Sequence, residues 1–135
     1  MVTVDLPAAR RLAVTIVMSQ ALLTAVIAMG CLLAFGPLAA KSAALGGGVN
    51  VLANLAMVLF AFGRPAGADA AQVARSFYVG EGVKLAVMVV AFVAVLTTTK
   101  VAMAPMFGAY VATFFVYWVA LANALPPLGG RPANR

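Results

Sequence analysis

The sequence contains no histidine, a single cysteine and only three acidic residues among its 135 residues. With one thiol, at Cys31, one copy of the chain can form neither an internal disulfide nor a zinc site built from histidine and cysteine. Two of the acids, Asp5 and Asp69, are expected in a tail and in a loop, which leaves no pairing of a nucleophile with a base. We therefore expect no enzymatic activity, no metal site and no cofactor.

Charge is also scarce in this chain. Charged residues make up 9% of the sequence and hydrophobic residues 65%, whereas a soluble domain has about 25% charged residues. Such a sequence cannot cover an apolar core with polar side chains, so the expected surroundings are the lipid bilayer. The net charge of +6 does not indicate binding to nucleic acid, because the basic residues are scattered and do not alternate with aromatic residues.

Four long apolar blocks account for most of the chain. Each has about 20 residues or more, enough to cross a hydrocarbon core roughly 30 Å thick. They occupy residues 12–35, 43–62, 77–96 and 101–125, and residues 63–76 form the longest connection. The sequence predicts an all-α membrane protein, a single domain over residues 1–135 whose four transmembrane helices form two antiparallel hairpins.

Arginine and lysine are distributed unevenly over the segments between these blocks. Cytoplasmic segments next to transmembrane helices carry an excess of both residues. Six arginines on one side against two lysines on the other predict that both termini and the loop at residues 63–76 are cytoplasmic. The first set is Arg10, Arg11, Arg64, Arg75, Arg131 and Arg135, and the second set is Lys41 and Lys100.

The second block begins with three glycines and carries two amide side chains. Asn50 and Asn54 are four residues apart and therefore lie on one face of a helix. Gly46 and Gly47 allow another backbone to come close, and the amides can form hydrogen bonds between helices. This face is predicted to be a helix contact surface. No Gly-Lys-Ser or Gly-Lys-Thr follows the glycines, so they do not indicate a phosphate-binding loop.

The third block contains an acid and a base inside a span. Glu81 and Lys84 are three residues apart, so they share a helix face and would largely neutralise each other. If the second and third spans form a hairpin, Asn54 and Glu81 lie at similar depth and are expected to be partners. Gly80 and Gly82 flank the acid and would let the second span approach it.

Two interpretations of these polar residues stay open. In one, Asn50, Asn54, Glu81 and Lys84 form a satisfied internal cluster that fixes helix packing. In the other, Glu81 faces a partner protein or an ion path, as ionisable residues within the membrane often do.

Polar residues of the first and fourth spans are expected to bond to neighbouring helices. Tyr117 and Trp118 fit an aromatic belt at the cytoplasmic interface. The other residues are Thr15, Ser19, Gln20, Thr24, Thr113 and Asn123.

These features together resemble a known family. The glycine-rich start of the second span, Asn54, the cytoplasmic loop and the pattern Phe77-x-x-Gly80-Glu81-x-x-Lys84 are similar to ATP synthase protein I, a family of small accessory membrane proteins encoded with the subunits of bacterial F-type ATP synthases. The resemblance covers chiefly residues 46–96. Ala53 departs from it, because family members often have proline just before the asparagine.

The resemblance implies a multi-pass protein of the bacterial cytoplasmic (inner) membrane that helps the ring of c subunits to assemble. The implied partners are c subunits and lipid, and homo-oligomers are left open. Family members have also been proposed to move magnesium or calcium, in which case Glu81, Asn50 and Asn54 would be the ligands. The residues implied in partner contact or in an intramembrane polar cluster are Gly46, Gly47, Asn50, Asn54, Phe77, Gly80, Glu81 and Lys84.

Overall fold

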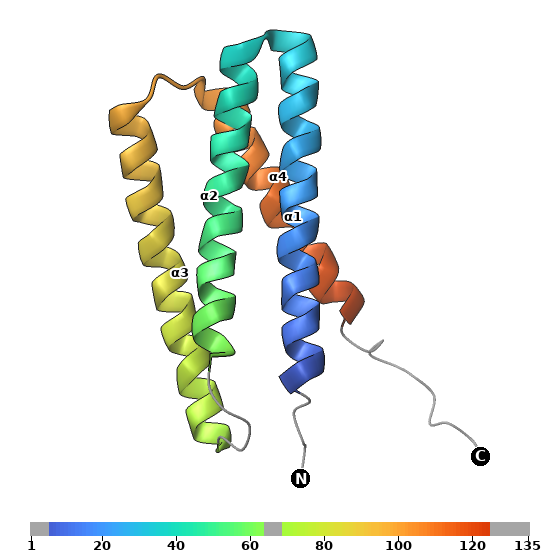
Figure 1. Cartoon of the computed structure of the whole chain (residues 1–135), viewed down its shortest axis with the longest axis vertical. Helices are drawn as coiled ribbons and strands as arrows, with labels where there is room; N and C mark the ends of the chain where they lie inside the picture. Colours follow the sequence, from blue (N-terminus) through green and yellow to red (C-terminus); the bar gives the residue numbers. More distant parts are fainter. Residues whose placement is uncertain (1–5, 64–68, 125–135) are drawn as a thin grey trace, which may run out of the picture.

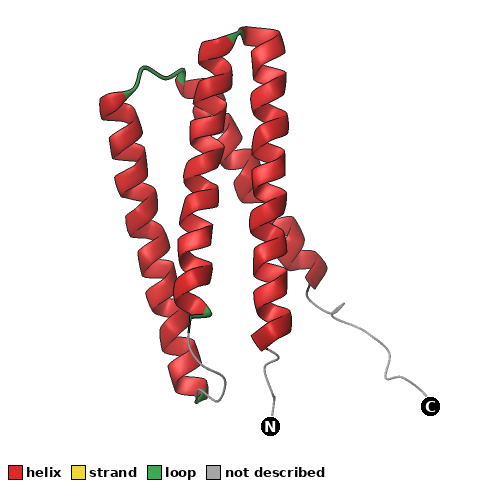
Figure 2. Cartoon of the chain, in the orientation of Figure 1, coloured by secondary structure: helices red, strands yellow, loops and turns green. Residues whose placement is uncertain are grey.

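The computed structural model of the chain describes residues 6–63 and 69–124, which form four helices joined by short connections. The helices are α1 (Leu6–Phe35), α2 (Pro37–Ala61), α3 (Ala70–Thr98) and α4 (Met103–Ala124) (Figures 1 and 2). Each helix is long and apolar enough to cross a membrane. The prediction of an all-helical protein with four such segments is confirmed.

Helices are the expected form for these segments, because a lone segment in lipid must satisfy its own backbone hydrogen bonds. A single residue, Gly36, separates α1 from α2 and has a φ of 90°, a conformation that glycine adopts without a steric penalty. Pro37 follows at the start of α2, where its missing N–H is not needed.

Two connections are shorter than the sequence predicted. Residues 37–42 belong to α2, so the first turn consists of Gly36 alone. Residues 70–76, predicted as part of the cytoplasmic loop, form the first two turns of α3. Polar residues such as Lys41 and Arg75 interrupt the apolar blocks of the sequence, but they do not end the helices, which include both residues.

The central element of the bundle is α2. It packs against α1, α3 and α4, whereas α1 meets only α2 and α4, and in the described part of the chain the backbone of α3 approaches α2 alone. Figure 1 shows α4 running obliquely behind α2 and α1. The predicted arrangement of two antiparallel hairpins is not confirmed, because α3 and α4 do not pack as a pair and both lie against α2.

Small residues let α2 approach α1 and α4 closely. A Cβ atom on Gly46 would overlap the carbonyl group of Met106 in α4, and one on Gly47 would overlap the side chain of Thr24 in α1. At the start of α2, the Ser42 hydroxyl accepts a hydrogen bond of 2.8 Å from the backbone N–H of Ala102. The predicted contact surface therefore exists, and its occupants are helices of the same chain.

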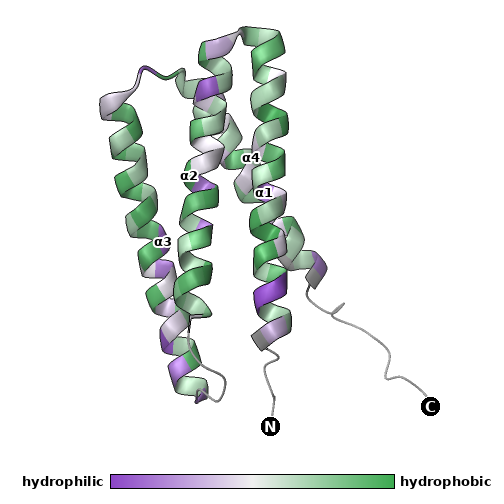
Figure 3. Cartoon of the chain, viewed as in Figure 1, coloured by the Kyte–Doolittle hydropathy of each residue, from purple (hydrophilic) through white to green (hydrophobic). Residues whose placement is uncertain are grey.

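The outer surface suits a bilayer. Many large apolar side chains are exposed on all four helices, and most of the length of each helix has hydrophobic colouring in Figure 3. The ends of α1 and α4 that lead to the termini lie at the same end of the bundle (Figure 1).

The neighbouring glycines Gly46 and Gly48 give a test of this packing. Gly46→Ala is expected to lower the free energy of unfolding by about 1–3 kcal/mol, the usual cost of overpacking. Gly48 has nothing within 4 Å of an added Cβ, so Gly48→Ala is expected to be neutral or to stabilise by up to about 1 kcal/mol. Unfolding of both purified variants in the same mild detergent measures the difference, and equal effects would contradict the packing described.

Candidate functional site

A buried network of polar side chains connects three helices near the middle of the bundle. Gln20 of α1, Asn50 and Asn54 of α2 and Thr113 of α4 are each at most 4% exposed. The expectation that Gln20 and Thr113 bond to neighbouring helices is confirmed. Such groups are costly to bury without partners, so their hydrogen bonds constrain how the helices meet.

Each amide of the network donates in a defined direction. Gln20 Nε2 donates to the backbone carbonyl of Thr113 at 3.1 Å, which leaves Gln20 Oε1 to accept from Asn54 Nδ2 at 2.8 Å. Asn54 Nδ2 also lies 3.3 Å from Asn50 Oδ1, and Asn50 Nδ2 donates to Thr113 Oγ1 at 2.9 Å. Because the Thr113 carbonyl can only accept, it determines the orientation of the amides that follow.

One atom remains without a partner. Among the described residues, Asn54 Oδ1 is the buried side-chain oxygen or nitrogen atom that makes no hydrogen bond. Turning the Asn54 amide over would place its oxygen against two other acceptor oxygens, so the observed orientation is preferred. The network therefore ends in an unused hydrogen-bond acceptor.

The pairing expected between Asn54 and Glu81 was wrong, because Asn54 bonds to α1 and to its own helix. The buried residues of α3 are Ser76 and Gly80, and Gly80 lies against α2, with its added Cβ 3.3 Å from the Met57 carbonyl oxygen. Glu81 follows Gly80 and therefore points about 100° away around the helix.

Glu81 is half-buried, and in the ranges that the structure describes it forms neither a hydrogen bond nor an ion pair. Lys84 does not neutralise it directly. Its Nζ lies 4.9 Å from the centre of the Tyr117 ring of α4, in a cation–π contact. The acid and the base share a helix face as predicted, but the base interacts with another helix.

Long side chains bridge α3 and α4 where their backbones diverge. The ring of Phe92 stacks on Phe107 and meets Tyr110 edge-on, with ring centres 5.7 and 5.1 Å apart. The Tyr110 hydroxyl donates to the sulfur of Met88 at 2.8 Å. Lys84 and Tyr117 make a further contact one or two turns closer to the termini.

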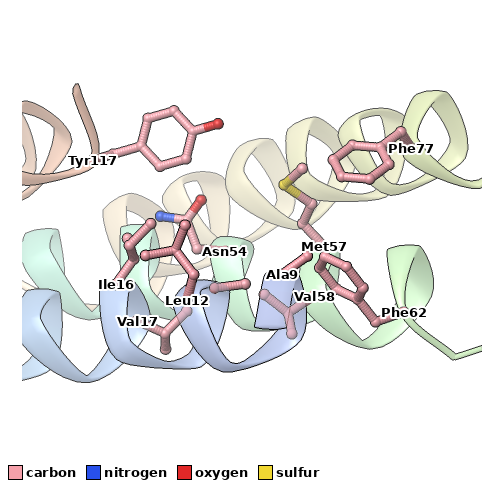
Figure 4. Close-up of a pocket in the computed structure, with 11 residues that line it drawn as sticks. Ala9, Leu12, Ile16, Val17, Asn54, Met57, Val58, Phe62, Phe77 and Tyr117 are labelled. Carbon is pink, nitrogen blue, oxygen red and sulfur yellow. The ribbon is translucent and has the colours of Figure 1, made fainter. Parts of the chain in front are cut away.

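A pocket of about 190 Å³ lies between the first half of α1, the last turns of α2 and the start of α3. Asn54 and Tyr117 are its two polar side chains. Figure 4 shows Tyr117 at one end of the pocket, Phe62 and Phe77 at the other, and the oxygen of Asn54 directed toward the side where Tyr117 lies. The other lining residues are Ala9, Leu12, Ala13, Ile16, Val17, Met57 and Val58.

Five of the predicted site residues lie at two places, whereas Gly80, Glu81 and Lys84 lie at neither. Gly46, Gly47 and Asn50 lie inside the interface of α2 with α1 and α4. Phe77 borders the pocket, and its ring meets that of Phe62 edge-on at 5.8 Å. Asn54 belongs to both places.

Sequence reasoning missed the role of Tyr117 in this site, because its position near the predicted interface suggested a belt. Trp118 is exposed, as a belt residue would be. Lys84 and Tyr117 lie on different helices, so no spacing along the sequence indicates that they are in contact.

No group of three potential metal ligands among histidine, cysteine, aspartate and glutamate occurs in the part of the chain that the structure describes. Asn50 and Asn54 use their amide nitrogens within the network. Glu81 and the two asparagines, named together as ion ligands, share no hydrogen bond in the described residues.

Comparison with known proteins connects this arrangement to a family. A family model described as the ATP synthase I chain matches residues 15–111. The chain belongs to this family. A protein of Pseudomonas aeruginosa named ATP synthase protein I is 39% identical to it over 117 residues, which cover 85% of this chain and 88% of that protein. No solved structure matches the chain.

The family expected from residues 46–96 is therefore confirmed, and the match to the ATP synthase I chain extends over parts of all four helices. It includes the network, with Gln20 on α1 and Asn54 on α2, but ends before Thr113 on α4.

A double-mutant cycle between Gln20 and Asn54 tests the network. Gln20→Leu and Asn54→Leu are each expected to lower the free energy of unfolding, and the coupling between them should be about 0.6 kcal/mol, the average for hydrogen bonds between membrane helices. Denaturant unfolding in mixed micelles provides the measurement. Thr15→Val is the control, since the Thr15 hydroxyl bonds only within α1. Additive effects of the two network changes would show that no hydrogen bond links these amides.

Proposed function

We propose that this protein is an accessory factor of the F-type ATP synthase that assists assembly of the c-subunit ring and performs no catalysis itself. Its membership of the ATP synthase I chain family supports the association with the synthase. The contact with c subunits is made within the membrane, through α3.

Glu81 is the observation that carries this proposal. A carboxylate at membrane depth is costly, and such residues mark functional contacts by default. Glu81 is half-buried and forms neither a hydrogen bond nor an ion pair with the described residues of its own chain. A c-subunit helix beside α3 would supply the missing partner.

The arrangement of helices favours α3 over the glycine face of α2. Gly46 and Gly47 already pack against α4 and α1, so a c subunit could reach them only if the bundle opened. In contrast, α3 has only two buried residues, Ser76 and Gly80. It can lose or gain a neighbour without disturbing the network between the other helices.

Ion transport is a less favoured function. It would require oxygen ligands around a path, whereas Asn50 and Asn54 bond within the network and not to Glu81. The proposal therefore assigns Glu81 to a protein contact.

We further propose that the protein lies in the bacterial inner membrane with both termini in the cytoplasm. The excess of arginine at the ends that carry the termini supports this orientation.

The assembly proposal predicts the behaviour of Glu81→Gln. Tagged protein is purified in mild detergent from cells that express the membrane subunits of the synthase, and the eluate is probed for c subunit. Wild type is expected to retain c subunit and Glu81→Gln to retain several-fold less, with unchanged unfolding. Asp69→Asn is the matched control, because it removes one negative charge at the start of α3, where Asp69 makes no capping hydrogen bond. Absence of c subunit with the wild type would refute the proposal.

The orientation predicts the labelling of single cysteines. In a Cys31→Ser background, Thr99→Cys is expected to react with a membrane-impermeant maleimide on intact spheroplasts, and Asp69→Cys only after permeabilisation. These residues lie just beyond opposite ends of α3. The reverse pattern would place the termini outside.

A further inference from the structure

The pocket beside Asn54 has the properties of a binding site that the chain itself leaves incomplete. Its walls are apolar, apart from Asn54 and Tyr117. Its lining includes Asn54, whose side chain is 4% exposed and whose Oδ1 is an acceptor without a partner. A buried acceptor of this kind is normally satisfied by a donor.

The volume limits what can enter. A cavity of roughly 150 Å³ with apolar walls accommodates benzene, and this pocket measures about 190 Å³. It therefore accepts an apolar group up to the size of one aromatic ring. A water molecule would find only the minimum of its two to four polar partners, because Asn54 and Tyr117 are the polar side chains of the lining, whereas the remaining walls favour an apolar group.

The pocket opens between α1 and α3. Its most exposed lining residues, Leu12 of α1 and Phe77 of α3, are 42% and 41% exposed. The two helices that carry them make no close backbone contact within the described ranges. A group that enters between α1 and α3 comes from the side of the bundle, at the level of the last turns of α2. A lipid chain could enter by this route, but it has no donor for Asn54 Oδ1.

We propose that this pocket receives one side chain from a transmembrane helix of a c subunit, a side chain with an apolar body and a single O–H or N–H donor that bonds to Asn54 Oδ1. This inference rests on the proposed function, and it adds a second contact to that of Glu81. Phe77 and Glu81 are four residues apart and lie on one side of α3, so one partner helix can meet both.

Photo-crosslinking from the rim of the pocket tests the proposal. Phe77 is replaced by p-benzoylphenylalanine, which retains an aromatic ring, in full-length protein expressed with the synthase membrane subunits. Irradiation is expected to join residue 77 to a transmembrane peptide of the c subunit, identified by mass spectrometry. The same probe at Tyr78, which is 80% exposed on the adjacent face, is expected to give mainly lipid adducts.

Two pairs of variants separate the role of the acceptor from that of the fold. Asn54→Leu is expected to reduce the crosslink about threefold or more, the factor that corresponds to one average hydrogen bond between membrane helices. Asn50→Leu is the matched control, because it disrupts the same network but Asn50 does not line the pocket. Ala13→Phe fills the pocket and should abolish the crosslink, whereas Ala25→Phe, on an exposed part of α1, should not.

The possible outcomes distinguish this inference from the function on which it rests. If c subunit copurifies in a Glu81-dependent manner but residue 77 crosslinks only to lipid or to a second copy of this chain, the pocket proposal fails and the assembly proposal stands. Equal losses with Asn50→Leu and Asn54→Leu would also overturn the role of the acceptor. If no c subunit copurifies at all, both proposals fail.

Discussion

The bundle depends on the amide network at which α1, α2 and α4 meet. In lipid, apolar side chains gain little by moving from acyl chains to other helices, so close packing and hydrogen bonds must hold the helices together. Gln20, Asn50, Asn54 and Thr113 supply the bonds. Gly46 and Gly47, one or two turns away, allow the close approach. A Cβ atom at either position would overlap α4 or α1.

The same constraint explains why α3 differs from the other helices. It contributes no side chain to the network, it buries only two small residues, and it meets α4 through long side chains. A helix held in this way has fewer contacts to lose if it moves, and helices that change neighbours are expected among the less stable parts of a structure. Glu81 and Lys84 both lie on this helix.

Lys84 and Glu81 illustrate how tertiary contacts alter a local pattern. Their spacing predicts mutual neutralisation along α3, but the Tyr117 ring attracts the Lys84 ammonium group across to α4. The carboxylate of Glu81 is thereby left without a hydrogen bond or an ion pair in the described residues. Lys84 therefore connects α3 to α4, whereas the carboxylate of Glu81 is available for the partner proposed above.

The sequence by itself determined the number of spans, the helical fold and the family. Each depends on composition and local spacing: twenty or more apolar residues in a row require a helix in lipid, and Phe77-x-x-Gly80-Glu81-x-x-Lys84 is a local pattern. It also indicated that Asn50 and Asn54 share one face, because residues four positions apart are separated by about one helical turn.

Only the tertiary structure decided which residues that face meets. Gln20 and Thr113 are 93 positions apart, and no periodicity within a single helix indicates how two helices are rotated about their axes relative to each other. That rotation paired Asn54 with Gln20 instead of Glu81, left Asn54 Oδ1 unused and placed Tyr117 beside the pocket. It follows from where the small residues of α2 allow each neighbour to approach, which is a property of packed surfaces in three dimensions.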